Sequence, residues 1–161
     1  MIYWFLIMVG MVFADQITKW LAVILLKGKE SFPLWEGVFH FTYVENTGAA
    51  FGILKDQRWV FMILSTVMIA AFLVYFVTQY KNTDNLFRAA VSMVIAGGIG
   101  NMIDRSTLGY VVDFLDFTLI DFAVFNVADS FVCVGAGLFV LWVILDTVKN
   151  LKAKKVTDVQ S

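Results

Sequence analysis

Long apolar runs alternate with shorter polar stretches along this chain, and four of the runs stand out. They cover about residues 2–26, 59–79, 88–104 and 125–148. Each is near the ~20 residues that an α-helix needs to cross the hydrocarbon core of a bilayer. The pattern therefore predicts an all-α integral membrane protein with four transmembrane helices.

Two of these runs carry further signals. The first begins at the initiator Met with no basic segment ahead of it, and it is too long for the apolar core of a cleaved signal peptide. We therefore expect it to remain in the mature protein. The run at 88–104 is the shortest and is rich in glycine. Its outer end is expected to lie against protein or water and not against lipid.

A different pattern occupies the polar stretch between the first two runs. In residues 39–44, the aromatic residues Phe39, Phe41 and Tyr43 fall on one face of an extended strand, with polar residues on the other. Residues 45–52 follow with turn-forming and small residues. This predicts a small extracytoplasmic β platform that can hold an extended peptide. An aromatic belt at the membrane interface explains the same composition equally well.

Composition agrees with a membrane protein. Of the 161 residues, 60% are hydrophobic and 16% aromatic, and the mean hydropathy is +0.81; soluble domains are roughly half apolar. The length admits one polytopic domain, residues 1–161, and no separate soluble module. A net charge of -1 gives no indication of a nucleic-acid partner.

The basic residues orient the chain, because Lys and Arg gather on the cytoplasmic side of membrane proteins. The side that holds both termini carries six (Lys81, Arg88, Lys149, Lys152, Lys154 and Lys155), and the other side carries five (Lys27, Lys29, Lys55, Arg58 and Arg105). The C-terminal cluster is dense and adjoins a helix end. We therefore place both termini in the cytoplasm and the loops at about 27–58 and 105–124 outside.

Cysteine and histidine chemistry is not indicated. Cys133 is the only cysteine and lies in an apolar run, so no disulfide forms within the chain. The only histidine, His40, is far from it in sequence, although a nucleophilic cysteine needs a base beside it. We expect no metal and no other cofactor.

Acidic residues in the predicted helices require an explanation, because a carboxylate at the bilayer centre costs roughly 2.5 to 3.5 kcal/mol. Asp15 has Lys19 four residues later, a spacing that favours an ion pair on one helix face. The functional alternative is that Asp15 or Lys19 contacts a substrate. Asp104 and Asp129 are the other candidates, and both fall at the outward ends of their helices.

Asp104 and Asp129 each belong to a stripe of small and polar residues along one helix face. The stripe that ends at Asp104 contains two glycines and Asn101, and glycines let a neighbouring backbone come close. A similar stripe begins at Asn126 and includes Asp129. If the stripes face each other, the two aspartates meet and share a proton. One carboxylate then takes a proton from water while the other polarises the scissile carbonyl, as in an aspartyl protease.

Spacing alone leaves other interpretations open. In one alternative, each aspartate is held by a partner such as Arg105, Asn101 or Asn126 and only orders helix packing. In another, the acids form an ion or proton pathway. Asp113 and Asp116 lie in the second outer loop, where we expect them to be solvated or paired at the surface. Asp113 is also a candidate support for the catalytic pair.

Five short blocks follow one another along the chain. They are residues 15–19 (DQITK), 46–51 (NTGAAF), 97–105 (GGIGNMIDR), 112–114 (VDF) and 125–130 (FNVADS). In this order, and with four apolar spans, they resemble the lipoprotein signal peptidases, also called signal peptidase II. Each block alone is a weak signal, but the five together cover nearly the whole chain and are specific.

The resemblance implies catalytic roles for Asp104 and Asp129. It also implies that Asn46, Asn101, Arg105 and Asn126 line the active site. We add Asp15, Lys19, Gly48 and Asp113 as candidate supporting or substrate-binding residues. The resemblance further implies the reaction, which is removal of signal peptides from prolipoproteins on the amino side of a diacylglyceryl-modified cysteine. The expected setting is the outer face of the bacterial cytoplasmic membrane, with a monomeric enzyme whose partners are its substrates and membrane lipids.

The sequence departs from the family in one place and from rival proteins in others. Residues 121–124 stand where family members often carry a proline, so the approach to the last helix is expected to differ in shape. Presenilin-like proteases place an aspartate directly after Gly-x-Gly, whereas Asn101 follows that motif here. A transporter should show repeats or broken helices in two halves, and neither is evident. A purely structural subunit is the third alternative, since polar packing between helices is common.

Overall fold

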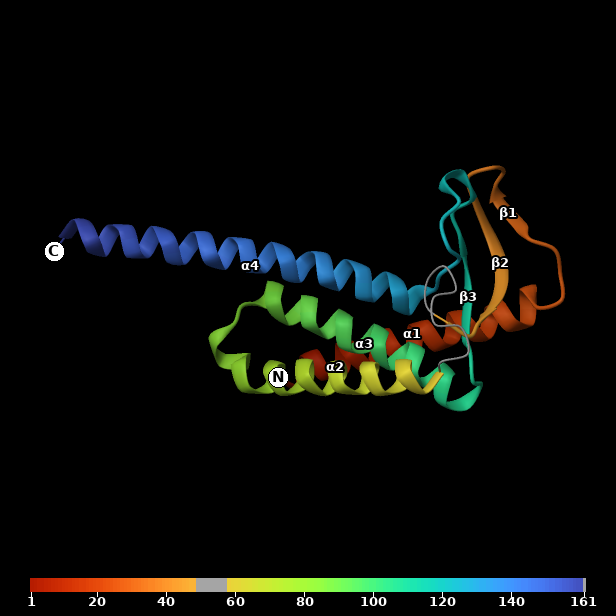
Figure 1. The fold of residues 1–161 in the computed structure, drawn as a ribbon, viewed down its shortest axis with the longest axis horizontal. Helices are drawn as coiled ribbons and strands as arrows, with labels where there is room; N and C mark the ends of the chain where they lie inside the picture. Colours follow the sequence, from red (N-terminus) through yellow and green to blue (C-terminus); the bar gives the residue numbers. More distant parts are fainter. Residues whose placement is uncertain (49–57, 161) are drawn as a thin grey trace.

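The computed structural model of the protein describes residues 1–48 and 58–160. Four long helices lie side by side, and a small antiparallel sheet stands across one end of them (Figure 1). The helices are α1 (Ile2–Leu26), α2 (Arg58–Gln79), α3 (Asn85–Thr107) and α4 (Val127–Gln160). The strands are β1 (Phe32–Trp35), β2 (Phe39–Asn46) and β3 (Val111–Asp116), with short 3-10 turns at η2 (Tyr80–Asn82) and η3 (Thr118–Ile120). The predicted fold class is confirmed.

All four of these helices are long and apolar enough to cross a membrane. Two of them differ in length from the sequence prediction. α3 begins three residues earlier, at Asn85, because the carboxylate of Asp84 accepts the backbone N–H of Phe87 at 3.0 Å and caps the helix. α4 begins at Val127 and continues well past residue 148. Both termini lie away from the sheet (Figure 1).

α3 is the central helix. In the apolar segment of α3, 44% of the residues are buried inside the protein, against 17% in α1 and 6% in α2 and α4. Glycine allows α4 to approach it closely: a Cβ at Gly97 would collide with the backbone oxygen of Ala128, and one at Gly135 would lie 2.8 Å from the backbone oxygen of Ala90. The outward faces of the helices carry many large exposed hydrophobic side chains, which suits contact with lipid.

The sheet has the order β1-β2-β3, and both strand pairs are antiparallel. Val44 pairs with Asp113 and Glu45 pairs with Val112. Val112 and Phe114 pack with Ala22 in a small hydrophobic cluster, which fixes the sheet on the end of α1. The predicted β platform is therefore present, and it brings β3 over the ends of the helices. The part of that prediction that falls on residues 49–52 lies outside the described residues.

Candidate active site

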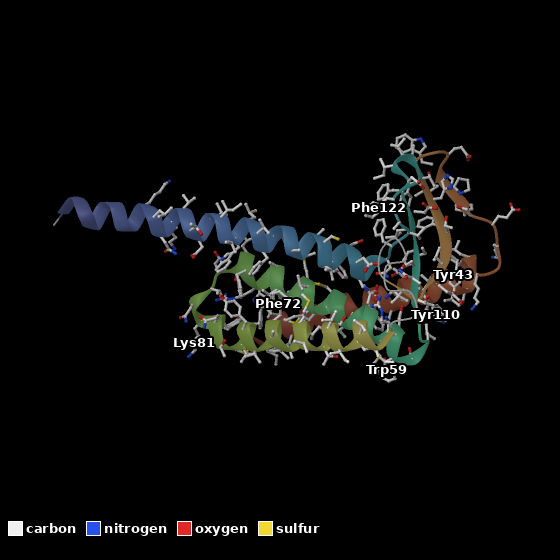
Figure 2. All side chains as sticks on the ribbon, viewed as in Figure 1. Tyr43, Trp59, Phe72, Lys81, Tyr110 and Phe122 are labelled. Carbon is white, nitrogen blue, oxygen red and sulfur yellow. The ribbon has the colours of Figure 1, made fainter. Side chains whose placement is uncertain are left out.

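A cavity of about 650 Å³ lies between α2, α3, α4 and the connection from β3 to α4. Most of its wall is apolar. Figure 2 shows two of the lining rings, Phe72 among the helices and Phe122 near the sheet. The polar groups that line it come mainly from the helix and strand ends near the sheet: Asn46, Asn101, Arg105, Asp113, Asp129 and Ser130. An apolar cavity with a few convergent polar groups is the usual form of a binding site.

Asp113 is one of the two carboxylates in the wall of this cavity. It is 1% exposed and accepts hydrogen bonds from Asn46 Nδ2 at 2.8 Å and Asn126 Nδ2 at 2.6 Å. Burial, and after it the negative charge of Asp129, raise the pKa of Asp113 to about 6, although the two amide donors act in the opposite direction. The prediction that Asp113 is solvated in a loop was wrong, because pairing with β2 makes 111–116 a strand and draws this side chain inward.

Asp129 is the other carboxylate in the cavity wall, and it lies in the first turn of α4. Its Oδ1 accepts from Asn101 Nδ2 at 2.7 Å, and its Oδ2 accepts from the backbone N–H of Asn126 at 3.2 Å. Asn126 Oδ1 in turn accepts the backbone N–H of Asp129 at 2.9 Å. Asn126 therefore caps α4 and also holds Asp113, so one amide side chain links the two acids.

Asp104 does not take the place beside Asp129 that its helical stripe predicts. Its Oδ2 lies 3.1 Å from Lys19 Nζ, and its Oδ1 accepts from Gln16 Nε2 at 3.0 Å, so the side chain faces α1. Its exposed fraction is 3%, and it is not among the residues that line the cavity. The stripe does face α4, but Asn101, one turn earlier, is the residue that reaches Asp129.

The predicted ion pair between Asp15 and Lys19 is confirmed. The two side chains are buried and their charged atoms lie 3.0 Å apart. Lys19 Nζ also donates to Asn101 Oδ1 at 2.9 Å, so the ammonium contacts Asn101 and two buried carboxylates, Asp15 and Asp104. The alternative, direct contact of these side chains with a substrate, has no support in this arrangement.

Arg105 and Gly48 close another side of the site. Arg105 Nη2 donates to the backbone oxygen of Gly48 at 3.1 Å, and Asn46 Oδ1 accepts the backbone N–H of Gly48 at 2.9 Å. These contacts tie the end of β2 to the end of α3.

The ten residues singled out from the sequence are thus connected by these contacts near the ends of α3 and α4 that adjoin the sheet. In residues 1–48 and 58–160, no three His, Cys, Asp or Glu side chains are grouped as metal ligands.

Comparison with known proteins identifies the family. The model of the signal peptidase (SPase) II family matches residues 7–145. The chain belongs to the signal peptidase II family. It is therefore a multi-pass membrane protein of a bacterial peptidase family, as its motifs predicted.

Individual relatives cover nearly the whole chain. The lipoprotein signal peptidase of Brevibacillus brevis is 43% identical over 148 residues, which are 91% of this chain and 99% of that protein. The lipoprotein signal peptidase of Bacillus subtilis is 37% identical over 151 residues, 92% and 97% of the two chains. A solved bacterial membrane enzyme is 34% identical and superposes with a TM-score of 0.82 over 90% of this chain and 89% of that one.

Gln16 is a site residue that the sequence prediction missed. Its side-chain amide donates to Asp15 Oδ2 at 3.2 Å, to Asp104 Oδ1 at 3.0 Å and to the backbone oxygen of Gly100 at 3.2 Å. A signal was present, since Gln16 is a polar residue inside an apolar helix and adjoins Asp15. Ala128 was also missed as a contact, and here the group involved is a backbone N–H, which residue type does not reveal.

Proposed function

We propose that the protein is an aspartyl endopeptidase that removes signal peptides from prolipoproteins, with Asp113 and Asp129 as its catalytic pair. The observation that carries the proposal is that these two carboxylates line one cavity and are joined through Asn126. This replaces the pair expected from the sequence, in which Asp104 stood in the place of Asp113.

The electrostatics of Asp113 suit the chemistry. Its pKa is raised to about 6 by burial and by the charge of Asp129, so a proton is readily kept between the two acids. The ionised carboxylate takes a proton from a water molecule, which attacks the scissile carbonyl. The protonated carboxylic acid polarises that carbonyl and then supplies a proton to the leaving amine. Each step uses only the two acids and the water.

Asp104 is poorly placed for such a role. All of its acceptor contacts are directed at Lys19, Gln16 and the backbone N–H of Val112. Both of its carboxylate oxygens are therefore occupied by groups outside the cavity, and neither is directed at Asp129. The distribution of the acids also argues against a proton pathway, because Asp15, Asp104, Asp113 and Asp129 gather in one cluster and do not extend along the span.

The cavity suits a lipidated peptide. Its apolar wall between α2, α3 and α4 offers room for acyl chains, and its polar end holds the acids where a peptide bond would be cut. Relatives at 37–43% identity are named lipoprotein signal peptidases. We infer cleavage on the amino side of a diacylglyceryl-modified cysteine, by a monomer whose sheet and acids lie at the outer face and whose two termini are cytoplasmic.

The test is a cleavage assay on four purified full-length proteins in detergent: wild type, Asp113→Asn, Asp129→Asn and Asp104→Asn. The substrate is a prolipoprotein with a diacylglyceryl cysteine, beside the same peptide without lipid. We expect wild type to cut only the lipidated form. Asp113→Asn and Asp129→Asn should each lose activity by about 10³-fold or more, since acid–base groups contribute on the order of 10²–10⁴. Asp104→Asn should retain measurable turnover.

Two results would overturn this assignment. Turnover near the wild-type level in folded Asp113→Asn, with none in Asp104→Asn, would restore Asp104 to the pair. Absence of cleavage by folded wild type on either peptide would remove the peptidase proposal itself. Asp146→Asn is the matched control, because Asp146 lies on α4 far from the cavity and contacts Asn150.

A further inference from the structure

The backbone N–H groups just before the two proposed catalytic acids are each held by a buried carboxylate. Ala128 N donates to Asp15 Oδ1 at 2.8 Å, and Ala128 precedes Asp129. Val112 N donates to Asp104 Oδ2 at 3.1 Å, and Val112 precedes Asp113. The same type of contact therefore occurs at the start of α4 and on β3, one a helix and the other a strand.

One ammonium group joins these two carboxylates. Lys19 Nζ lies 3.0 Å from Asp15 Oδ2 and 3.1 Å from Asp104 Oδ2, and Lys19 is 3% exposed. Gln16, which directly follows Asp15 on α1, donates to both carboxylates. α3 closes the cluster from its own side, since a Cβ at Gly100 would lie 2.5 Å from Asp15 Oδ2. The cluster is thus buried among α1, α3 and the start of α4.

We propose that Asp15, Lys19 and Asp104 are positioning residues that set the separation of Asp113 and Asp129. The proposal rests on the catalytic pair proposed above. Asp113 comes from a strand and Asp129 from a helix, so the distance between their carboxyl groups depends on how those two backbones are placed. Lys19 fixes both placements through Asp15 and Asp104. A misplacement of about 1 Å at a reacting group can reduce the rate by about a hundredfold.

A role in stability alone accounts less well for this arrangement. Taking charges out of water is costly, and a buried ion pair is weak evidence for stability. A role in holding the helices together explains why the N–H groups of Ala128 and Val112 have acceptors, but it does not explain why one ammonium joins the two acceptors beside the proposed acids. The two carboxylates contact those N–H groups at 2.8 and 3.1 Å.

The first experiment reads the backbone directly and does not depend on activity. Amide resonances of Val112 and Ala128 are followed by NMR in full-length protein in detergent, for wild type and Lys19→Met. We expect both amide resonances to shift and hydrogen exchange of the two amides to accelerate by about tenfold or more. The reason is that the carboxylates that accept these N–H groups lose their shared cation. Asp84→Ala is the matched control: it removes a carboxylate that accepts a backbone N–H on α3, and only the region of Phe87 should change.

The second experiment measures kcat, KM and the pH profile of Asp15→Asn, Asp104→Asn and the double variant. Each substitution keeps the size and an acceptor oxygen but removes a charge. We expect kcat to fall about ten- to hundredfold with KM nearly unchanged. The two apparent pKa values of the profile should move closer together, because carboxyl groups that move apart interact less. Since both residues act through Lys19, the double variant should fall by less than the product of the single effects.

These measurements decide the proposal in every case. Unchanged amides together with an unchanged pH profile in variants that merely melt earlier would show a structural role and overturn it, as would fully multiplicative effects in the double variant. If Lys19→Met does not fold, the same amides are measured in the two Asp→Asn variants. If Asp113→Asn cleaves normally, the assignment of Asp113 to the catalytic pair is wrong. The Val112 and Ala128 amides still report whether the cluster holds the backbones of β3 and α4.

Discussion

Asn126 donates its side-chain amide to the carboxylate of Asp113 at 2.6 Å. The same side chain accepts the backbone N–H of Asp129, so it joins β3 to the start of α4. Asn126→Ala should therefore lower kcat about ten- to hundredfold through displacement of the acids, and should lower stability by about 1 kcal/mol through loss of the helix cap.

A steady-state cleavage assay and a thermal unfolding curve measure the two effects of Asn126→Ala. Asn150→Ala removes an amide that bonds Asp146 on an exposed part of α4, and it should change neither quantity appreciably. An Asn126→Ala protein with a normal kcat would show that the acids do not need this link.

The pKa of Asp113 makes a prediction about stability and pH. Because this pKa is raised from 3.8 to about 6 in the folded protein, the folded state binds more protons than the unfolded state between these values. Stability from this group is thus present below about pH 4 and is lost as pH rises through 6, by about 3 kcal/mol in all. The unfolding midpoint of wild type should decline more steeply from pH 4 to pH 7 than that of Asp113→Asn. Parallel curves would contradict the raised pKa.

Close packing of α3 against α4 predicts unequal effects for two glycine substitutions. Gly97→Ala places a methyl group against the backbone oxygen of Ala128 and 2.8 Å from Val132 Cγ2, so α4 must shift. We expect a loss of about 1–3 kcal/mol in stability and a fall in kcat, since Ala128 adjoins Asp129. Gly137→Ala meets nothing within 4 Å and should gain roughly 0.5–1 kcal/mol from helix propensity. Equal unfolding midpoints for the two variants would rule out the packing argument.

The cavity can be tested through its cysteine. Cys133 lines the cavity, is exposed and is the only cysteine of the chain. Reaction with a bulky maleimide should therefore raise KM for the lipidated substrate strongly, because the adduct occupies the space proposed for acyl chains. Cys133→Ala should cleave normally with or without the reagent. Full activity of quantitatively labelled wild type would place the acyl chains elsewhere.

The four helices, the platform and the Asp15–Lys19 pair followed from the sequence because each depends on local periodicity or on a spacing within one helix. The pair of acids proposed here as catalytic did not. Helical spacing shows which residues share a face with Asp104, but it does not show which of them contacts Asp129. In the structure that residue is Asn101. The burial of Asp113 depends on the register of β2 with β3, which joins segments 67 residues apart at the contact of Asn46 with Asp113. Asp104 pairs with Lys19 on α1, and this contact between two helices cannot be predicted from the sequence pattern within either helix.

The 34 residues of α4 make it the longest helix of the described chain. At 1.5 Å per residue it extends roughly 50 Å, whereas the hydrocarbon core of a bilayer is about 30 Å thick. Asp129 lies in its first turn, so the far end of the helix is roughly 45 Å from the proposed chemistry. An affinity tag or a surface tether attached at that end of α4 would not reach the substrate. The far end of α4 is therefore a suitable point for immobilising the protein in the assays described above.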